Sequence, residues 1–461
     1  MAHDTPLLPA ELAQIILGHL DDTSIPPARL VSTQWCGMLD NRFRDAQRAR
    51  GSSICDAAAA SGQLGILQSL HERGFPLSAK TCAAAARGDH LEILQWLRAR
   101  DCPWNIETCS QAAERGHLRI LRWAIGRGCP HDRQECCKRA AEGGHLRALQ
   151  LLASNRDCLN ADTCARAAKR GHLNVLEWLH HNGCPWDSST CIQAAVNGHY
   201  ATLLWALDNG CSGSAIVCFV IAADGRLDVL QQVRARGCPW DADTCLYAAL
   251  HGHIHVLIWA RTHGCPWNEL TCVWAASRGL THMLLWVHAN GCPWDARTCT
   301  VLAERGHLEA LVWARAKGCP WNVETCSAAA SIGRLDMLQW ARANGCPWDK
   351  NTCEYAAAGG HLYVLQWART NGCPWDRRIC SEAASRGHLD ILQWARANDC
   401  PWDAKTCVKA TEGGHLEVLQ WARANGCPWD KRTYDAAQRA GHLHIMRWAR
   451  EMGCPMPAPS S

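Results

Sequence analysis

Residues Cys346 to Gly372 read Cys-Pro-Trp-Asp-Lys-Asn-Thr-Cys-Glu-Tyr-Ala-Ala-Ala-Gly-Gly-His-Leu-Tyr-Val-Leu-Gln-Trp-Ala-Arg-Thr-Asn-Gly, and variants of this stretch recur along the chain. The turn cysteine returns every 27 residues, at Cys184, Cys211, Cys238, Cys265, Cys292, Cys319, Cys346, Cys373, Cys400, Cys427 and Cys454. A period between 20 and 50 residues is the signature of a solenoid, in which each unit buries its apolar face against its neighbours. The sequence therefore predicts a repeat protein that works by surface recognition.

Each repeat is expected to contain two short helices. Asp349 follows a Pro-Trp turn and precedes an Ala-rich stretch, so it is a good N-cap for a helix that runs to about Ala358 and ends at Gly359 or Gly360. His361 then opens a second helix, which the following Asn-Gly and Pro stop. The apolar residues of this helix follow helical spacing: Leu362, Leu365, Trp367 and Ala368. No room is left for a strand, so the predicted class is all-α.

A second column of cysteines sets the number of repeats. Its members are Cys55, Cys82, Cys109, Cys164, Cys191, Cys218, Cys245, Cys272, Cys299, Cys326, Cys353, Cys380 and Cys407, with Tyr434 in the last place. With an irregular unit at Cys136 and Cys137, about fifteen repeats lie between about Ser53 and Cys454. We therefore expect one solenoid over residues 51–461, preceded by a small domain over residues 1–50.

Composition indicates an intracellular protein. The first residues offer no basic region, and Glu11 interrupts the apolar stretch that follows, so we do not expect a signal peptide. No run reaches the eighteen apolar residues of a membrane span. The 30 cysteines are then expected to be reduced, and a net charge of +4 is too small to indicate nucleic acid by itself.

The periodic Trp, Cys and His residues are interpreted as structural. Ten of the 24 tryptophans stand in the Cys-Pro-Trp turns and twelve in the second helices, so they predict two stacked columns that hold the repeats together. An aromatic binding platform would need exposed rings at irregular places. Paired cysteines with six residues between them do not match zinc knuckles, so we expect buried thiols, no metal and no cofactor. Eleven histidines share one position before the second helix and are interpreted as turn residues.

The repeats resemble a known family. The run Ala-Ala-Ser-Arg-Gly-His-Leu-Asp-Ile-Leu at residues 383–392 is similar to the middle of the ankyrin repeat, and Gly-Cys-Pro-Trp-Asp at 426–430 falls where that family has Gly-Ala-Asp-Val-Asn. Ankyrin units have about 33 residues, so the missing residues fall in the β-turn finger. The chain looks like a shortened, finger-less ankyrin array of the kind encoded by large DNA viruses of amoebae. That resemblance implies a host cell's cytoplasm or nucleus.

The head of the chain resembles the F-box, which docks on Skp1. A Pro suits a helix start, and the leucines and isoleucines after it form one apolar face. The residues that the resemblance assigns to Skp1 binding are Leu8, Pro9, Leu12, Ile15, Ile16, Leu20, Val31 and Trp35. The alternative is a helical cap for the solenoid, which end repeats require. An F-box would imply an adaptor that bridges a Skp1–cullin ubiquitin ligase to a target, without chemistry of its own.

Positions that break the repeat indicate where a target binds. The two places after the first-helix cysteine and the two before the following turn vary freely. In the ankyrin family the latter face the ligand, so the expected target-binding residues are Phe219, Tyr247, Trp274, Arg278, Arg305, Tyr355 and Arg386. Aromatic and basic side chains favour an acidic or amphipathic partner. Solvated helix faces are the alternative.

Two further features bear on function and rigidity. An arginine recurs near the end of the second helix at Arg261, Arg315, Arg342, Arg369, Arg396, Arg423 and Arg450. The helix dipole accounts for it, but an arginine column could also follow an anionic polymer, so nucleic acid remains a second hypothesis and a plain scaffold a third. Ser-Gly-Ser at 212–214 replaces Pro-Trp-Asp, and Gln232 replaces the next Trp, which predicts a hinge between about 205 and 235.

Overall fold

The computed structural model describes residues 54–153 and 157–455. Within these residues all regular structure is helical, as the sequence predicts, and residues 54–60 form the first helix. The helices that follow are α3 (Leu64–Glu72), α4 (Ala79–Arg87), α5 (Leu91–Arg98), α6 (Ile106–Arg115), α7 (Leu118–Gly126), α8 (Arg133–Glu142), α9 (Leu146–Leu152), α10 (Ala161–Lys169), α11 (Leu173–His181), α12 (Ser188–Val196), α13 (Tyr200–Asp208), α14 (Ala215–Ala223), α15 (Leu227–Ala235), α16 (Ala242–His251), α17 (Ile254–Thr262), α18 (Glu269–Ser277), α19 (Thr281–Ala289), α20 (Ala296–Glu304), α21 (Leu308–Ala316), α22 (Val323–Ser331), α23 (Leu335–Ala343), α24 (Lys350–Ala358), α25 (Leu362–Thr370), α26 (Arg378–Arg386), α27 (Leu389–Ala397), α28 (Ala404–Glu412), α29 (Leu416–Ala424), α30 (Lys431–Ala440) and α31 (Leu443–Glu451).

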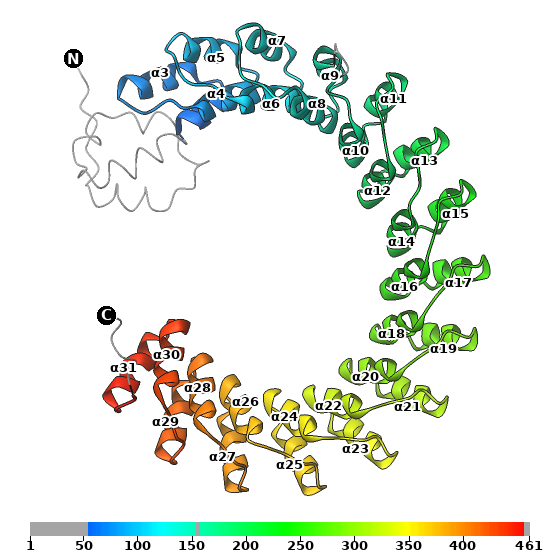
Figure 1. Cartoon of the computed structure of the whole chain (residues 1–461), viewed down its shortest axis with the longest axis vertical. Coiled ribbons are helices and arrows are strands. Elements are labelled where there is room, and N and C mark those ends of the chain that lie inside the picture. The colour runs from blue at the N-terminus through cyan, green and yellow to red at the C-terminus, as the bar shows by residue number, and fades with distance from the viewer. Residues whose placement is uncertain (1–53, 154–156, 456–461) are drawn as a thin grey trace, which may run out of the picture. The chain divides into compact units, whose positions relative to one another are not determined.

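Each repeat is a helical pair. The even-numbered helices are here called first-row helices and the odd-numbered ones second-row helices. From α4 to α13 and from α16 to α31, the first-row helices pack on one another in order, and each second-row helix packs against the first-row helix that precedes it (Figure 1). The Asp349 side chain accepts a hydrogen bond from the Asn351 amide at 3.0 Å, so it caps α24 as predicted. His361 occupies the N-cap of α25 without a side-chain cap bond.

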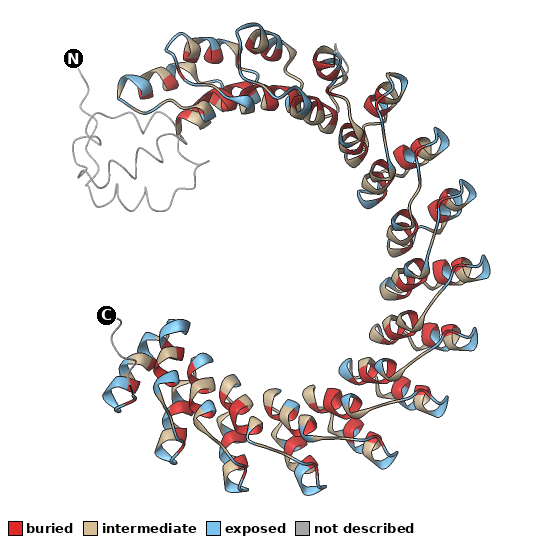
Figure 2. Ribbon diagram, in the orientation of Figure 1, coloured by how far each residue is buried: buried red, intermediate tan, exposed pale blue. Residues whose placement is uncertain are grey.

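The core consists of small and aliphatic side chains between the two rows (Figure 2). In the repeat of α24 and α25, Cys353, Ala356, Leu365 and Ala368 are fully buried, and the following turn cysteine, Cys373, is buried too. Ala and Cys allow adjacent first-row helices to approach closely, because neither side chain extends beyond Cβ or Sγ. The thiols are thus packing residues, in agreement with the sequence-based interpretation.

The tryptophans form partly exposed columns. Every tryptophan among the described residues is half-buried, so the stacked columns that the sequence predicts lie at the edge of the core and not inside it. Each turn Trp meets the Trp of the second-row helix that follows it edge to face, as Trp348 meets Trp367 with ring centroids 5.9 Å apart. The second-row helices end at the protein surface, so one side of each ring pair stays accessible to solvent. Each Trp pair lies within one repeat, so the packing between repeats comes from the buried Cys, Ala and Leu side chains.

Histidines tie neighbouring repeats together. The Nε2 atom of His361 lies 3.0 Å from the carbonyl oxygen of Ser331, thirty residues earlier. Ser331 is the last residue of α22, the first-row helix of the previous repeat. The same bridge recurs at His90, His117, His172, His253, His388 and His442. The rings lie against glycines with positive φ, such as Gly360, where a Cβ would approach the His388 ring to 2.8 Å. The sequence predicted turn residues here, and the structure shows that they also link repeats.

The chain divides into two compact units. Unit 1 comprises the residues up to Val217 together with 231–239, and unit 2 comprises 218–230 and the residues from Trp240 onward. The chain passes between the units within α14, within α15 and again after Pro239; the first two points lie inside the stretch 205–235 in which the sequence predicts a hinge, and the third lies just beyond it. The hinge itself stays a prediction. No helix among the described residues has the length and apolar character that crossing a membrane requires.

The irregular repeat in unit 1 has a local cause. The segment from the N-cap Asp132 to His145 is one residue longer than the corresponding segment from Asp349 to His361. The extra residue lies in α8, where Cys136 and Cys137 are both fully buried. The helix therefore accommodates the insertion without breaking the row.

Candidate interaction surface

A cluster of apolar side chains lies on the first-row helices of unit 2. On α18, Leu270 and Trp274 are four residues apart, and on α16 Tyr247 and Leu250 are three apart, so each pair shares one helix face. These side chains are half-buried, in contrast to the fully buried Cys and Ala on the opposite face. We define the apolar patch as the half-buried residues Phe219, Val220, Tyr247, Leu250, Leu270, Trp274 and Val301.

Aromatic rings connect two repeats of the patch. Phe219 on α14 and Tyr247 on α16 are stacked, with ring centroids 4.8 Å apart and an interplanar angle of 17°. Neither the Tyr247 hydroxyl nor the Trp274 indole N–H makes a hydrogen bond to another described residue. Tyr and Trp with free polar ends are the residues that most often dominate the binding energy of interfaces.

The edge of the patch near the C-terminal ends of α18 and α20 is basic. Arg278 and Arg305 are exposed, and neither forms an ion pair within the described part of the chain. Arg278 Nε donates to the Leu250 carbonyl at 2.6 Å, which orients its guanidinium beside the patch. Two exposed acidic residues lie on the same edge: Glu304, and Asp224 at the position after α14 that Arg278 and Arg305 occupy after α18 and α20.

The opposite edge carries charges that are already paired. Arg297 contacts Asp295 at 2.7 Å and Glu269 at 3.4 Å. Asp243, at the equivalent position of α16, is exposed. The unpaired cations therefore lie on one side of the patch only.

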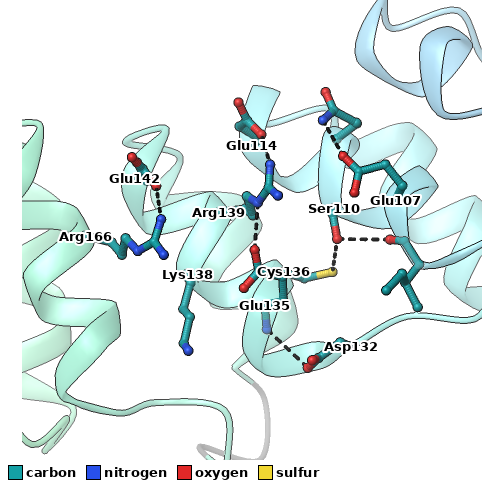
Figure 3. Close-up of polar contacts among 12 residues, drawn as sticks. Glu107, Ser110, Glu114, Asp132, Glu135, Cys136, Lys138, Arg139, Glu142 and Arg166 are labelled. Carbon is teal, nitrogen blue, oxygen red and sulfur yellow. Dashed lines mark hydrogen bonds and ion pairs between the residues drawn. The ribbon is translucent and has the colours of Figure 1, made fainter. Parts of the chain in front are cut away.

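The corresponding face of α6, α8 and α10 in unit 1 is an ion-pair network (Figure 3). Arg139 on α8 bonds to Glu135 at 2.8 Å and to Glu114 on α6 at 2.7 Å, and these bonds raise the pKa of its guanidinium. Arg166 on α10 bonds to Glu142 at 2.7 Å. Because the charges on this face already pair with one another, a protein partner would gain little binding energy from contacting them.

Two carboxyl groups on this face, those of Glu142 and Asp162, have lowered pKa values. Burial opposes ionisation of Glu142, but hydrogen bonds from Lys169 and Arg166 outweigh it and hold the pKa of that carboxyl below its usual value. A hydrogen bond from Lys138, at 2.9 Å, lowers the pKa of Asp162. The two first-row faces thus differ in kind, since one is ion-paired and the other is apolar.

The structure brings together five of the seven target-binding residues expected from sequence. Phe219, Tyr247 and Trp274 belong to the patch, and Arg278 and Arg305 lie on its edge. The other two lie outside it: Tyr355 on α24, 50% exposed, and Arg386 at the end of α26. Between them and the patch stands α22, whose equivalent positions hold the small buried residues Ser327 and Ala328.

The target-binding residues expected from sequence do not include four residues of the patch, namely Val220, Leu250, Leu270 and Val301. The signal for two of them was the helical spacing from one of the expected aromatic residues, since Leu250 lies three residues after Tyr247 and Leu270 four residues before Trp274. The residues expected to bind Skp1 (Leu8, Pro9, Leu12, Ile15, Ile16, Leu20, Val31 and Trp35) lie outside the described residues.

The thiols form buried pairs. The Cys82 thiol contacts the Cys102 sulfur at 3.6 Å, and the Cys102 thiol contacts the Ser78 carbonyl at 3.4 Å. The hydrogen bond to Cys102 and burial hold the pKa of the Cys82 thiol above its usual value, and burial raises the pKa of Cys55 to about 11. Thiols with a raised pKa are poor nucleophiles and poor metal ligands. Nowhere in residues 54–153 or 157–455 do three or more Cys, His, Asp or Glu converge as a metal site would require.

The arginine column is engaged in packing. Arg261, Arg315 and Arg369 lie 4.4, 4.4 and 4.5 Å from the centroids of the turn Trp rings that follow them. Each also donates to the carbonyl of the next turn cysteine, as Arg315 donates to Cys319 at 3.1 Å. Two histidines replace arginine in the column, and His288 stacks on Trp294 at 3.7 Å. These arginines and histidines therefore have a structural role, since they lie at the end of a second-row helix and pack on the Trp ring of the next turn.

No protein-family model and no curated protein matches this chain. Among solved structures it is similar to the pentatricopeptide repeat protein PPR10 from maize, with 14% identity, a TM-score of 0.31, and coverage of 96% of this chain and 82% of that one. It is also similar to the human ASB11 ankyrin repeat domain, with 17% identity and a TM-score of 0.33 over 40% of this chain and 98% of that one. Both are helical repeat proteins, as this chain is.

Proposed function

We propose that the chain is a protein-interaction adaptor, in which the apolar patch on unit 2 holds a target protein and the head, residues 1–50, docks on Skp1 of a cullin ubiquitin ligase. One observation supports the target site above all others. On α6, α8 and α10 the first-row face carries charged side chains that pair with one another. On α16 and α18 the same face carries the apolar and aromatic side chains of the patch, among them Tyr247 and Trp274.

The packing between repeats does not require this difference. Both units have the same buried cysteines and alanines in the core. The first-row face opposite the core could therefore carry polar side chains in every repeat without loss of packing. An apolar face in water costs free energy unless a partner covers it. The proposal gives the chain no catalytic step, since a scaffold acts by bringing two proteins together.

The ligase half of the proposal is supported by the F-box resemblance of the head. Its test is binding of the full-length chain to purified Skp1, measured by surface plasmon resonance. We expect micromolar or tighter binding that the double substitution Leu12→Ala/Ile16→Ala abolishes and that Trp274→Ala leaves unchanged. Absence of Skp1 binding by a folded chain would reduce residues 1–50 to a solenoid cap and leave a plain scaffold.

Nucleic acid is the weaker candidate. An arginine column that followed a polymer would need free guanidinium groups, whereas Arg315 is stacked on Trp321 and bonded to the Cys319 carbonyl. RNA binding that falls steeply with salt and survives the Leu12→Ala/Ile16→Ala substitution would reverse this preference.

A further inference from the structure

We propose that the occupant of the apolar patch is an acidic amphipathic helix, which lies across α14, α16, α18 and α20 with its carboxylates toward Arg278 and Arg305. The inference rests on the proposed function, because it names the kind of target that the adaptor holds.

The dimensions of the patch favour a helix that crosses the row. Four packed helices at roughly 8–10 Å between axes place the outer two about 24–30 Å apart. An α-helix of about 16–20 residues spans that distance at 1.5 Å per residue. Its apolar stripe, with contacts at i, i+3, i+4 and i+7, would meet Phe219 and Tyr247 at one end, Trp274 in the middle and Val301 at the other end.

The side chains of the patch suit a helix better than an extended segment. The described part of the chain contains no strand, so an extended partner would find no sheet edge on which to satisfy its backbone groups. A helix satisfies its own backbone and brings side chains only. The free Tyr247 hydroxyl and Trp274 N–H can then bond to polar side chains at the borders of its apolar stripe.

Charge fixes the orientation of the partner. Arg278 and Arg305 are the exposed cations on one edge, and neither has an ion pair among the residues that the structure describes. Carboxylates on the facing flank of the helix would pair with them, and Glu304 and Asp224 are the acidic neighbours on that edge. On the other edge Arg297 is already bonded to Asp295, and Asp243 is exposed, so carboxylates gain nothing there. A partner with acidic residues on one flank is therefore preferred over a basic one.

The test uses three fluorescently labelled helical peptides of about 20 residues. The first has leucines in one stripe and glutamates elsewhere, the second has lysines in place of the glutamates, and the third has the composition of the first with its leucines scattered around the helix. Binding to the full-length chain is followed by fluorescence anisotropy at several salt concentrations. We expect the acidic stripe peptide to bind at least about tenfold more tightly than either control peptide, and its affinity to fall with salt.

Substitutions in the full-length chain locate the binding site. Trp274→Ala is expected to weaken the acidic stripe peptide about tenfold or more, and Arg278→Gln/Arg305→Gln several-fold with a flatter salt dependence. Val301→Asp is a second variant at a half-buried position, in case Trp274→Ala disturbs folding, which circular dichroism detects. Tyr355→Ala is the matched control, because Tyr355 occupies the same repeat position on α24, outside the patch. It should leave binding unchanged.

Three outcomes would overturn the inference: no binding of the acidic stripe peptide, equal binding of the basic or scattered peptide, or binding that neither Trp274→Ala nor Val301→Asp weakens. These results are independent of Skp1. Peptide binding without Skp1 binding would retain the helix site and discard the ligase role, and the reverse result would retain the head's role and discard the helix site.

Discussion

The guanidinium of Arg342 lies 4.1 Å from the centroid of the Trp348 ring and donates a hydrogen bond to the carbonyl of Cys346. The arginine ends one second-row helix, and the tryptophan stands in the turn that leads to the next repeat. Every turn that carries a tryptophan follows an Arg or His six residues earlier, whereas Leu207 precedes the turn in which Gly213 replaces Trp. The cation and the ring therefore act as a pair.

A double-mutant cycle measures this pair. Arg342→Met keeps the apolar stem and removes the charge, and Trp348→Leu removes the ring. We expect each single substitution to lower the free energy of unfolding and the two together to cost less than their sum, with a coupling of about 0.5–1 kcal/mol, because the cation–π contact is lost only once. The measurement is urea unfolding followed by circular dichroism. Additive effects would show that Arg342 serves the helix end alone.

Alanine substitutions at two glycines with the same backbone conformation distinguish the cost of backbone strain from the cost of a side-chain clash. Gly360 and Gly372 both have φ of +81°, but a Cβ on Gly360 would lie 2.8 Å from the His388 ring, whereas nothing lies within 4 Å of one on Gly372. Gly372→Ala should cost about 1–2 kcal/mol from the left-handed backbone. Gly360→Ala should cost about 1 kcal/mol or more beyond that, because the His388 ring must move. Equal losses in urea unfolding would mean that the ring moves freely.

Buried threonine hydroxyls offer a stabilising change. Thr298 is fully buried, and its Oγ1 has no hydrogen-bond partner. Thr298→Val should raise the free energy of unfolding by about 1 kcal/mol, since it removes an unsatisfied buried hydroxyl at nearly constant volume. Thr163 is the matched control: it is also fully buried, but its hydroxyl donates to the Asn160 side chain at 3.1 Å. Thr163→Val should therefore lower stability by about 1 kcal/mol, and the same sign for both would contradict this account.

The sequence predicts the helices well because each is determined locally. Asp349 caps its helix, Gly359 follows that helix, and the 27-residue period fixes the pairing of rows. Contacts between repeats are less predictable, since His361 finds its acceptor on Ser331 and no local pattern encodes that register. The burial of Trp348 was overestimated for a related reason, because its environment depends on where the second-row helices end.

The candidate site was predicted in part. Aromatic residues that break the period, such as Tyr247 and Trp274, are visible in a sequence because packing between identical units does not explain them. Tyr355 breaks the period in the same way, but it lies outside the patch. What joins the patch residues is the succession of neighbouring helices with apolar side chains at one position, and a single aromatic residue cannot reveal that.

Histidine burial predicts that the solenoid loses stability in mild acid. Burial lowers the pKa of His145, His172 and His253 in the folded chain, so the unfolded chain binds protons more readily. The contribution of these neutral rings is complete above the unfolded value, about 6.5, and is lost as pH falls from there through the folded pKa. The groups around His172 are Glu142, whose carbonyl it contacts, and His199 and Arg170, whose positive charges would oppose its protonation.

The urea midpoint should therefore be lower at pH 5.5 than at pH 7.5. The carboxylates with lowered pKa, such as Glu142 and Asp162, contribute in a separate window, because their stabilisation is lost only as pH falls below about 4.5. His172→Asn should reduce the difference between the two midpoints. A midpoint that stays constant or rises toward pH 5.5 would contradict the buried neutral state of these rings.

Limited proteolysis tests the predicted hinge at 205–235. Two of the three points at which the chain passes between the units fall in this stretch, and the turn at Ser212 and Gly213 lacks the Trp that elsewhere meets a second-row ring. Proteinase K should therefore make its first cut between residues 205 and 235, since local opening is easiest where inter-repeat contacts are fewest.

A substitution in this turn sharpens the test. A Cβ on Gly213 would lie 2.6 Å from the Cys238 sulfur, so Gly213→Ala must push the turn away from its neighbour. We expect it to speed the first cut without moving it. Gly237→Ala is the matched control for space, because nothing lies within 4 Å of a Cβ there, although its φ of +79° adds backbone strain. A first cut in the regular repeats of α24 to α29 would show that the missing Trp does not weaken this stretch.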